Sequence, residues 1–138
     1  MGFGRQAGDR RQLTLLVLAL IYGAASFVHH AHNAQFLQQY PNMPAWVSAA
    51  GVYGAWFGTA ALGVLGYMLL RGGNERGGIL TLAIYGGFGF YGLAHYWIAP
   101  MWAHTLAMNL TIWCEVATAA MLLIGLGVVT ARQAPPGA

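Results

Sequence analysis

Four long apolar stretches dominate this chain and restrict its fold more than any other feature of the sequence. They cover approximately residues 12–32, 45–70, 78–98 and 101–130. Each is close to or longer than the ~20 residues that a helix needs to cross a hydrocarbon core of ~30 Å. Polar and apolar residues do not alternate along them, so membrane-spanning strands are not indicated. We therefore predict four transmembrane helices.

The scarcity of charge leads to the same conclusion. Of the 138 residues, 58% are hydrophobic and only 7% are charged, which is too little charge to cover a soluble domain of this length. The bilayer is therefore the expected surroundings of the chain. Six basic residues against three acidic ones are too small a surplus to indicate a nucleic-acid surface.

The arginines fall only in segments that lie on one side of the membrane after four crossings. Arg5, Arg10 and Arg11 precede the first stretch, Arg71 and Arg76 lie between the second and third, and Arg132 follows the fourth. The positive-inside rule makes this side cytoplasmic. We expect both termini there and place the chain in a bacterial cytoplasmic (inner) membrane.

Short connections between the stretches predict an antiparallel four-helix bundle in a single domain, residues 1–132, followed by a disordered tail, residues 133–138. A cleavable signal peptide is the alternative for the first stretch, because Gly23, Ala24 and Ala25 resemble a cleavage site. The apolar run continues through Phe27 and Val28, so we predict a retained helix.

The second and third stretches are rich in glycine, and Ala50, Gly54 and Gly58 recur at four-residue spacing. Small residues in such rows let helices approach closely in lipid, where the hydrophobic effect does not drive association. They predict close packing within the bundle, or an interface with a second copy or with a larger membrane complex.

All five histidines lie near the ends of the stretches opposite the arginines: His29, His30, His32, His95 and His104. At ~1.5 Å of rise per residue, the distances from Arg11 to His29 and from Arg76 to His95 are both about 27–29 Å. The histidines are therefore expected in one layer near the extracytoplasmic surface.

Imidazole nitrogens that converge from several helices suit a transition-metal ion such as zinc, copper or iron. We predict His29, His32, His95 and His104 as the metal ligands. Interfacial histidines can also be tolerated without any ligand. Haem b is the alternative cofactor, with Gly89 and Gly92 leaving space for the macrocycle.

Glu115 is the only acidic residue inside an apolar stretch, and lipid penalises a carboxylate by a few kcal/mol, so such a residue marks a functional site. A tight turn at Pro100 would place Glu115 ~16 Å below His104, opposite Tyr85 and Phe88. We predict Glu115, Asn109 and Tyr91 as catalytic residues in a cavity beneath the histidines. The simpler interpretation is a protonated carboxyl that makes one interhelical hydrogen bond.

These features predict a metal-binding membrane oxidoreductase or hydrolase that acts on a lipid-like substrate. Two alternatives stay open: a haem or metal carrier without turnover, and a non-catalytic accessory subunit of a larger membrane complex.

Overall fold

The structure of this chain, a computed structural model, describes the backbone of residues 3–131 and the side chains of residues 8–131. Within that range the chain is helical and forms no strand. The long helices are α1 (Phe3–Gln35), α2 (Ala49–Arg71), α3 (Glu75–Phe88) and α5 (Leu106–Ala131). The side chain of Arg5, Arg132 and the predicted tail 133–138 lie outside the described residues.

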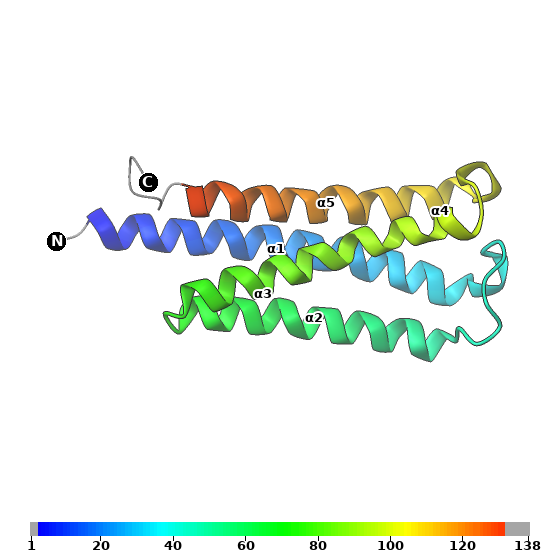
Figure 1. Cartoon of the computed structure of the whole chain (residues 1–138), viewed down its shortest axis with the longest axis horizontal. Helices are drawn as coiled ribbons and strands as arrows, with labels where there is room; N and C mark the ends of the chain where they lie inside the picture. Colours follow the sequence, from blue (N-terminus) through cyan, green and yellow to red (C-terminus); the bar gives the residue numbers. More distant parts are fainter. Residues whose placement is uncertain (1–2, 132–138) are drawn as a thin grey trace.

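Four segments of the described chain are long and apolar enough to cross a membrane: Gly8–Gln35, Ala49–Arg71, Glu75–Ile98 and Leu106–Ala131. This confirms the prediction of an all-helical chain with four candidate membrane spans. Consecutive segments are connected at alternate ends of the molecule, and the described chain begins and ends at the same end (Figure 1).

The third segment changes its helical geometry part of the way along. The α-helix α3 is followed by the 3₁₀-helix η2 (Gly89–Ala94) and the short α-helix α4 (His95–Ile98). A 3₁₀ run of six residues is long, since such runs seldom exceed 3–4 residues. Its larger rise of ~2.0 Å per residue places His95 further from the end where the termini lie than an α-helix would.

The helix starts follow from capping side chains. The Ser48 hydroxyl accepts a hydrogen bond from the Gly51 N–H at the start of α2. Asn74 caps α3 in the same way through the Gly77 N–H. Such caps satisfy amide groups that have no partner within the helix. Residues 45–48, which we predicted inside the second span, therefore precede the helix.

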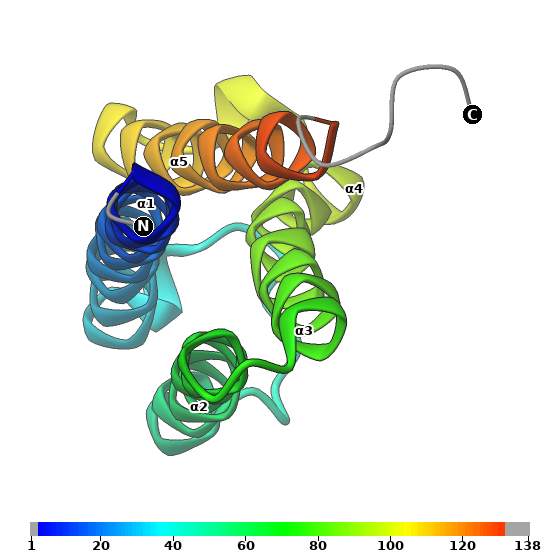
Figure 2. The ribbon, with the colours of Figure 1, turned by 90° about the vertical axis from the view of Figure 1, so that its left-hand side faces the viewer.

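The four long helices form a ring in the order α1, α2, α3, α5 (Figure 2). Their core is apolar toward the end where the termini lie, and it includes Leu15 from α1, Leu82 from α3 and Leu122 from α5. Toward the other end the core becomes aromatic, because the rings of Tyr22 and Tyr85 pack with their centroids 4.6 Å apart.

Glycines permit the closest approaches in this core. A Cβ on Gly63 would lie 2.8 Å from the Tyr85 ring, and a Cβ on Gly89 would lie 2.7 Å from the Tyr22 ring and overlap Ala119. A Cβ on Gly54 or Gly58 of the predicted row would meet no neighbouring atom within 4 Å. The close packing within this chain therefore uses other glycines than that row.

At the end where the termini lie, Arg11 of α1 forms an ion pair with Glu75, the first residue of α3. The carboxylate stands at a helix N-terminus, where negative charge is favourable. The Gln12 side-chain amide also donates to the Leu70 carbonyl at the end of α2. These contacts connect three helices at this end of the bundle.

Substitution of Gly89 tests the close packing of η2. We expect Gly89→Ala to lower the free energy of unfolding by roughly 1–3 kcal/mol, the usual cost of overfilling a packed core. Gly87→Ala is the matched control, since a Cβ on Gly87 meets nothing within 4 Å. Thermal or SDS unfolding in micelles measures both, and equal midpoints would contradict the packing described here.

Candidate functional site

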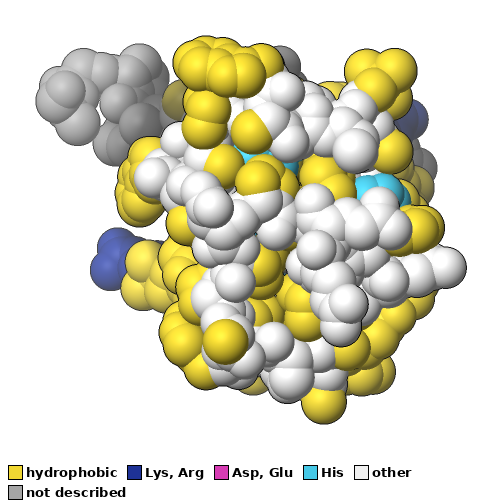
Figure 3. Space-filling model, turned by 90° about the vertical axis from the view of Figure 1, so that its right-hand side faces the viewer, with side chains coloured by type: hydrophobic (Ala, Val, Ile, Leu, Met, Phe, Trp, Pro, Cys, Tyr) yellow, Lys and Arg dark blue, Asp and Glu magenta, His cyan; other side chains and the backbone are white. Residues whose placement is uncertain are grey.

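The five histidines gather at the end of the molecule opposite the termini. Figure 3 shows this end, where histidine atoms are visible only through small openings between other side chains. His29 and His104 are 3% and 7% exposed, so both are buried, whereas His30, His32 and His95 are partly exposed. The five histidines therefore lie at one end of the molecule, as the sequence analysis predicted.

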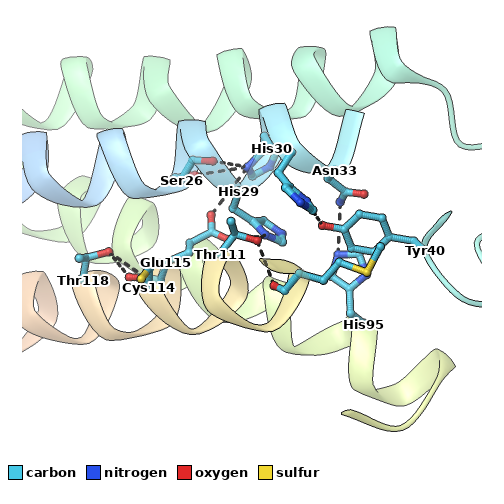
Figure 4. A network of polar contacts seen from close by, with 12 residues as sticks. Ser26, His29, His30, Asn33, Tyr40, His95, Thr111, Cys114, Glu115 and Thr118 are labelled. Carbon is cyan, nitrogen blue, oxygen red and sulfur yellow. Dashed lines mark hydrogen bonds and ion pairs between the residues drawn. The ribbon is translucent and has the colours of Figure 1, made fainter. Parts of the chain in front are cut away.

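Glu115 of α5 lies beside two of these histidines, both on α1 (Figure 4). Its Oε2 is 3.7 Å from His29 Nε2, and its Oε1 is 3.8 Å from His30 Nδ1. The Glu115 side chain is only 2% exposed. Both separations exceed the 2.7–3.2 Å of a good hydrogen bond. The carboxyl group is thus surrounded by imidazoles without being hydrogen-bonded to them.

The partners of His29 favour one tautomer. The Thr111 hydroxyl donates to the Met108 carbonyl over 3.0 Å, so toward His29 Nδ1, at the longer distance of 3.4 Å, it acts as an acceptor and favours a proton on Nδ1. In a neutral imidazole the other nitrogen then carries a lone pair. His29 Nε2 therefore presents a lone pair toward the Glu115 carboxyl group.

Two further histidines are fixed in the same tautomer. His30 Nδ1 lies 2.9 Å from the Ser26 carbonyl oxygen, and His104 Nδ1 lies 3.1 Å from that of Pro100. A carbonyl only accepts, so both Nδ1 atoms donate and each Nε2 is free. A hydrogen bond of this kind to the second nitrogen is the usual way in which proteins orient a metal-ligating histidine.

His95 joins the inner histidines to the outer ones. Its ring centroid is 5.5 Å from that of His29 and 6.1 Å from that of His104. Its Nε2 lies 3.2 Å from the amide nitrogen of Asn33, which donates to it. His32 lies further out, and its Nδ1 is 3.0 Å from the hydroxyl of Tyr40.

Two buried polar atoms flank the cluster without a hydrogen-bond partner among the described residues: the hydroxyl oxygen of Tyr22 and Oδ1 of Asn33. A buried polar atom left unpaired costs roughly 1–3 kcal/mol. Tyr22 lies in the aromatic part of the core below Glu115, and Asn33 lies beside His95. Unsatisfied polar groups thus occur on both sides of the histidines.

The predicted depth of Glu115 is wrong. A Cβ on Gly92 would lie 3.2 Å from Glu115 Oε2, so the carboxyl group is level with Gly92 and His29 rather than with Tyr85 and Phe88. The turn at Pro100 is not tight, because residues 99–105 form a loop that contains the 3₁₀-helix η3 (Met101–Ala103). Since α5 begins about five residues later than we predicted, Glu115 lies roughly 7 Å nearer the histidine end of the molecule than expected.

The other predicted catalytic residues are placed differently. Tyr91 is 77% exposed and lines a shallow apolar groove of about 450 Å³ on the outside of the bundle with Phe88 and Trp97. Asn109 accepts from the Tyr96 hydroxyl over 2.8 Å and donates to the carbonyls of Met101 and His104. Asn109 therefore anchors the loop that carries His104, and the structure does not bring Tyr91 to the histidines.

The sequence analysis did not single out Ser26, Tyr40 or Thr111, which contact the cluster, and it placed His30 in the histidine layer without giving it a role. A signal existed for Ser26 and His30, since they are four residues apart on one helical face. Tyr40 lies in a loop and Thr111 on a long helix, and nothing in their spacing sets them apart.

No group of three or more His, Cys, Asp or Glu side chains within the described part of the chain is arranged to hold a metal ion. Glu115 Oε2 and His29 Nε2 lie 3.7 Å apart, whereas the His30 atom that approaches Glu115 is Nδ1, which is hydrogen-bonded to the Ser26 carbonyl. A third nitrogen ligand would require one imidazole ring, such as that of His95, to turn toward Glu115.

Taken together, the helices and the cluster define a class: an integral membrane protein with four candidate spans and a buried carboxyl group among histidines. Comparison of the chain with family models, with curated proteins and with solved structures found no match.

Removal of the Asn109 amide tests its anchoring role. We expect Asn109→Ala to lower the free energy of unfolding by roughly 1–3 kcal/mol, because the Tyr96 hydroxyl and two backbone carbonyls lose their partner. The neighbouring Leu110→Ala is the control, since Leu110 is 55% exposed on the outside of the bundle. Thermal unfolding in micelles compares them, and an effect of Asn109→Ala no larger than that of Leu110→Ala would refute this role.

Proposed function

We propose that this chain binds a transition-metal ion between Glu115, His29 and a third ligand from the neighbouring histidines. The proposal includes an antiparallel transmembrane bundle with both termini cytoplasmic. In this arrangement the arginine-bearing segments face the cytoplasm and the histidines lie near the extracytoplasmic surface of a bacterial inner membrane.

One observation carries this proposal. His29 Nε2 presents a lone pair to Glu115 Oε2 at 3.7 Å, in surroundings where both side chains are almost completely buried. Two facing acceptors repel each other unless a cation lies between them. With metal–ligand distances of ~2.1 Å, a separation of 3.7 Å corresponds to an angle of roughly 120° at the ion.

The donors around this position suit a metal of the zinc, copper or iron type, because imidazole nitrogen and carboxylate oxygen are their common protein ligands. His95, whose ring centroid is 5.5 Å from that of His29, is our candidate for the third nitrogen, and His104, 6.1 Å beyond His95, is the alternative. His32 is hydrogen-bonded to Tyr40 further out, so we now assign it an outer role rather than that of a direct ligand.

Haem b fits this site less well than a single ion. The space that Gly89 and Gly92 were expected to leave for a macrocycle is filled, by Ala119 and Tyr22 at Gly89 and by Glu115 at Gly92. A haem would have to separate η2 from α5 at the point where the two pack most closely.

The polar cluster is closed toward the end of the molecule where the termini lie. Beneath Glu115 lie the Tyr22 and Tyr85 rings, and beneath these the core consists of leucines such as Leu15, Leu82 and Leu122. This disfavours a proton path through the whole chain and favours entry of an ion or substrate from the histidine end.

The order Thr111, His29, Glu115 resembles the hydroxyl, imidazole and carboxylate of a nucleophilic triad, but the hydrogen bonds run the wrong way. The Thr111 hydroxyl proton is directed to the Met108 carbonyl and not to His29, so the imidazole is not placed to remove it. A hydrolase at this site would instead use a metal-bound water. An oxidoreductase would use a redox-active metal, and in both cases we propose a lipid-like substrate.

A shared proton is the second candidate, because a proton also relieves the repulsion between two facing acceptors. In that case Glu115 or His29 holds the proton, and the cluster acts as an acid–base site without metal. A haem or metal carrier would bind its group without a reaction, whereas in a non-catalytic accessory subunit of a larger membrane complex the histidines would be incidental.

Metal analysis of protein purified without a histidine tag tests the proposal. We expect about one zinc, copper or iron ion per chain, and we expect each substitution of a single ligand to weaken its binding. His29→Ala, His95→Ala and Glu115→Gln are each expected to reduce occupancy by at least roughly tenfold, since loss of a direct ligand costs more than loss of an outer partner.

Cys114→Ala is the matched control for these variants, since Cys114 is exposed on α5 next to Glu115. The variant also tests whether a thiolate takes part in binding. Its metal content is expected to equal that of the unmodified protein. A folded protein that contains no metal after growth in medium supplemented with zinc, copper or iron would contradict the metal proposal. The shared proton would then be the supported alternative. Full occupancy in Glu115→Gln would remove the carboxylate from the ligand set.

A further inference from the structure

Tyr40 is a loop residue that is buried almost as completely as the core. It follows the 3₁₀-helix η1 (Leu37–Gln39) in the connection between α1 and α2, yet it is only 3% exposed. Loop side chains usually lie at the surface. The burial of an aromatic ring at this place therefore requires a specific reason.

The reason is the histidine cluster, which Tyr40 contacts with both its hydroxyl and its ring. The hydroxyl is 3.0 Å from His32 Nδ1. The ring centroid is 4.9 Å from that of His95 and 6.3 Å from that of His104. Figure 4 shows the Tyr40 ring beside His95 and Asn33, at the end of the cluster away from Glu115.

Burial raises the pKa of Tyr40 to about 12, so the phenol keeps its proton at neutral pH. A neutral phenol both donates and accepts hydrogen bonds. Tyr40 therefore orients His32 without bringing a negative charge to the histidines.

A second contact, made by Asn42, holds the same loop in place. The Asn42 side-chain amide donates to the Ile98 carbonyl over 3.1 Å, which ties the loop to the outer end of the third segment. Asn42 has a φ of 56°, a left-handed conformation that asparagine tolerates better than most residues. The chain is thus held across the outer end of the cluster by Tyr40 on one side and Asn42 on the other.

We propose that Tyr40 is a positioning residue that closes the loop end of the histidine cluster against water and fixes the part of the cluster at that end. The ring packs against His104, which is buried, and against one side of His95, which is partly exposed, and the hydroxyl sets the orientation of His32. As a consequence, an ion that leaves the site proposed above through the loop end has to pass Tyr40. The consequence for the ion rests on the proposed function, whereas the closure itself does not.

Chemical modification of the imidazoles tests the closure independently of any metal. The metal-free protein in micelles is treated with diethylpyrocarbonate, and the rate at each histidine is followed by mass spectrometry of peptides. We expect Tyr40→Ala to raise the rates at His95 and His104 by roughly tenfold, since local opening makes a protected group accessible. His29 should stay protected, because it is held by Thr111 and lies deeper beside Glu115.

Two variants separate the ring from the hydroxyl and from the loop. Tyr40→Phe keeps the ring, so it should leave the rates at His95 and His104 as they are in the unmodified protein and raise the rate only at His32. Gln38→Ala alters an exposed residue of the same loop and should change none of the rates. Unchanged rates in Tyr40→Ala would overturn the proposal, and so would an equal rise at all five histidines, because Tyr40 would then support the fold as a whole.

The exchange of bound metal provides the second measurement. We expect Tyr40→Ala to lose its ion to a water-soluble chelator roughly tenfold faster than the unmodified protein, with Tyr40→Phe close to normal. Equal rates in a metal-loaded Tyr40→Ala protein would overturn the role of Tyr40 in retention. If the protein binds no metal, the metal proposal fails alone, and the modification rates still decide whether Tyr40 closes the cluster.

Discussion

A carboxyl group in an apolar span has to find a proton or a counter-charge inside the protein, and this requirement organises the outer half of the chain. Glu115 meets it among the imidazoles of α1, at the level where Gly92 lets η2 approach α5. A side chain at Gly92 would occupy the space of the carboxyl group. The close packing of the third segment on α5 and the existence of the cluster therefore have the same cause.

Much of the architecture was predictable because it depends on properties that are continuous along the chain. Long apolar runs require helices in lipid, and all four candidate spans were found close to their predicted positions. The gathering of the histidines at one end also followed, since rise per residue is nearly constant in a helix. Register failed at the loop 99–105, where the backbone does not follow helical rise and Pro100 gave no indication of the loop's length.

The details of the cluster were not predictable, because they depend on contacts between residues far apart in the sequence. The tautomer of His29 is set by Thr111, 82 positions away, and the orientation of His32 is set by a loop tyrosine. Tyr91 lies only four residues from His95, yet it faces outward because it occurs in a 3₁₀ stretch whose three-residue period changes the exposed face. Helical spacing alone does not reveal such a change.

The division of the core into a polar outer half and an apolar inner half has an electrical consequence in an energised membrane. A charge moved across the whole bilayer exchanges ~2.3 kcal/mol with a potential of 100 mV. In the orientation proposed above, a cation that reaches Glu115 from the histidine end crosses only part of the membrane, and the apolar core with its leucines occupies the rest of the thickness. Binding of a cation at the proposed site is therefore expected to depend less on the membrane potential than passage of the same ion through the whole chain would.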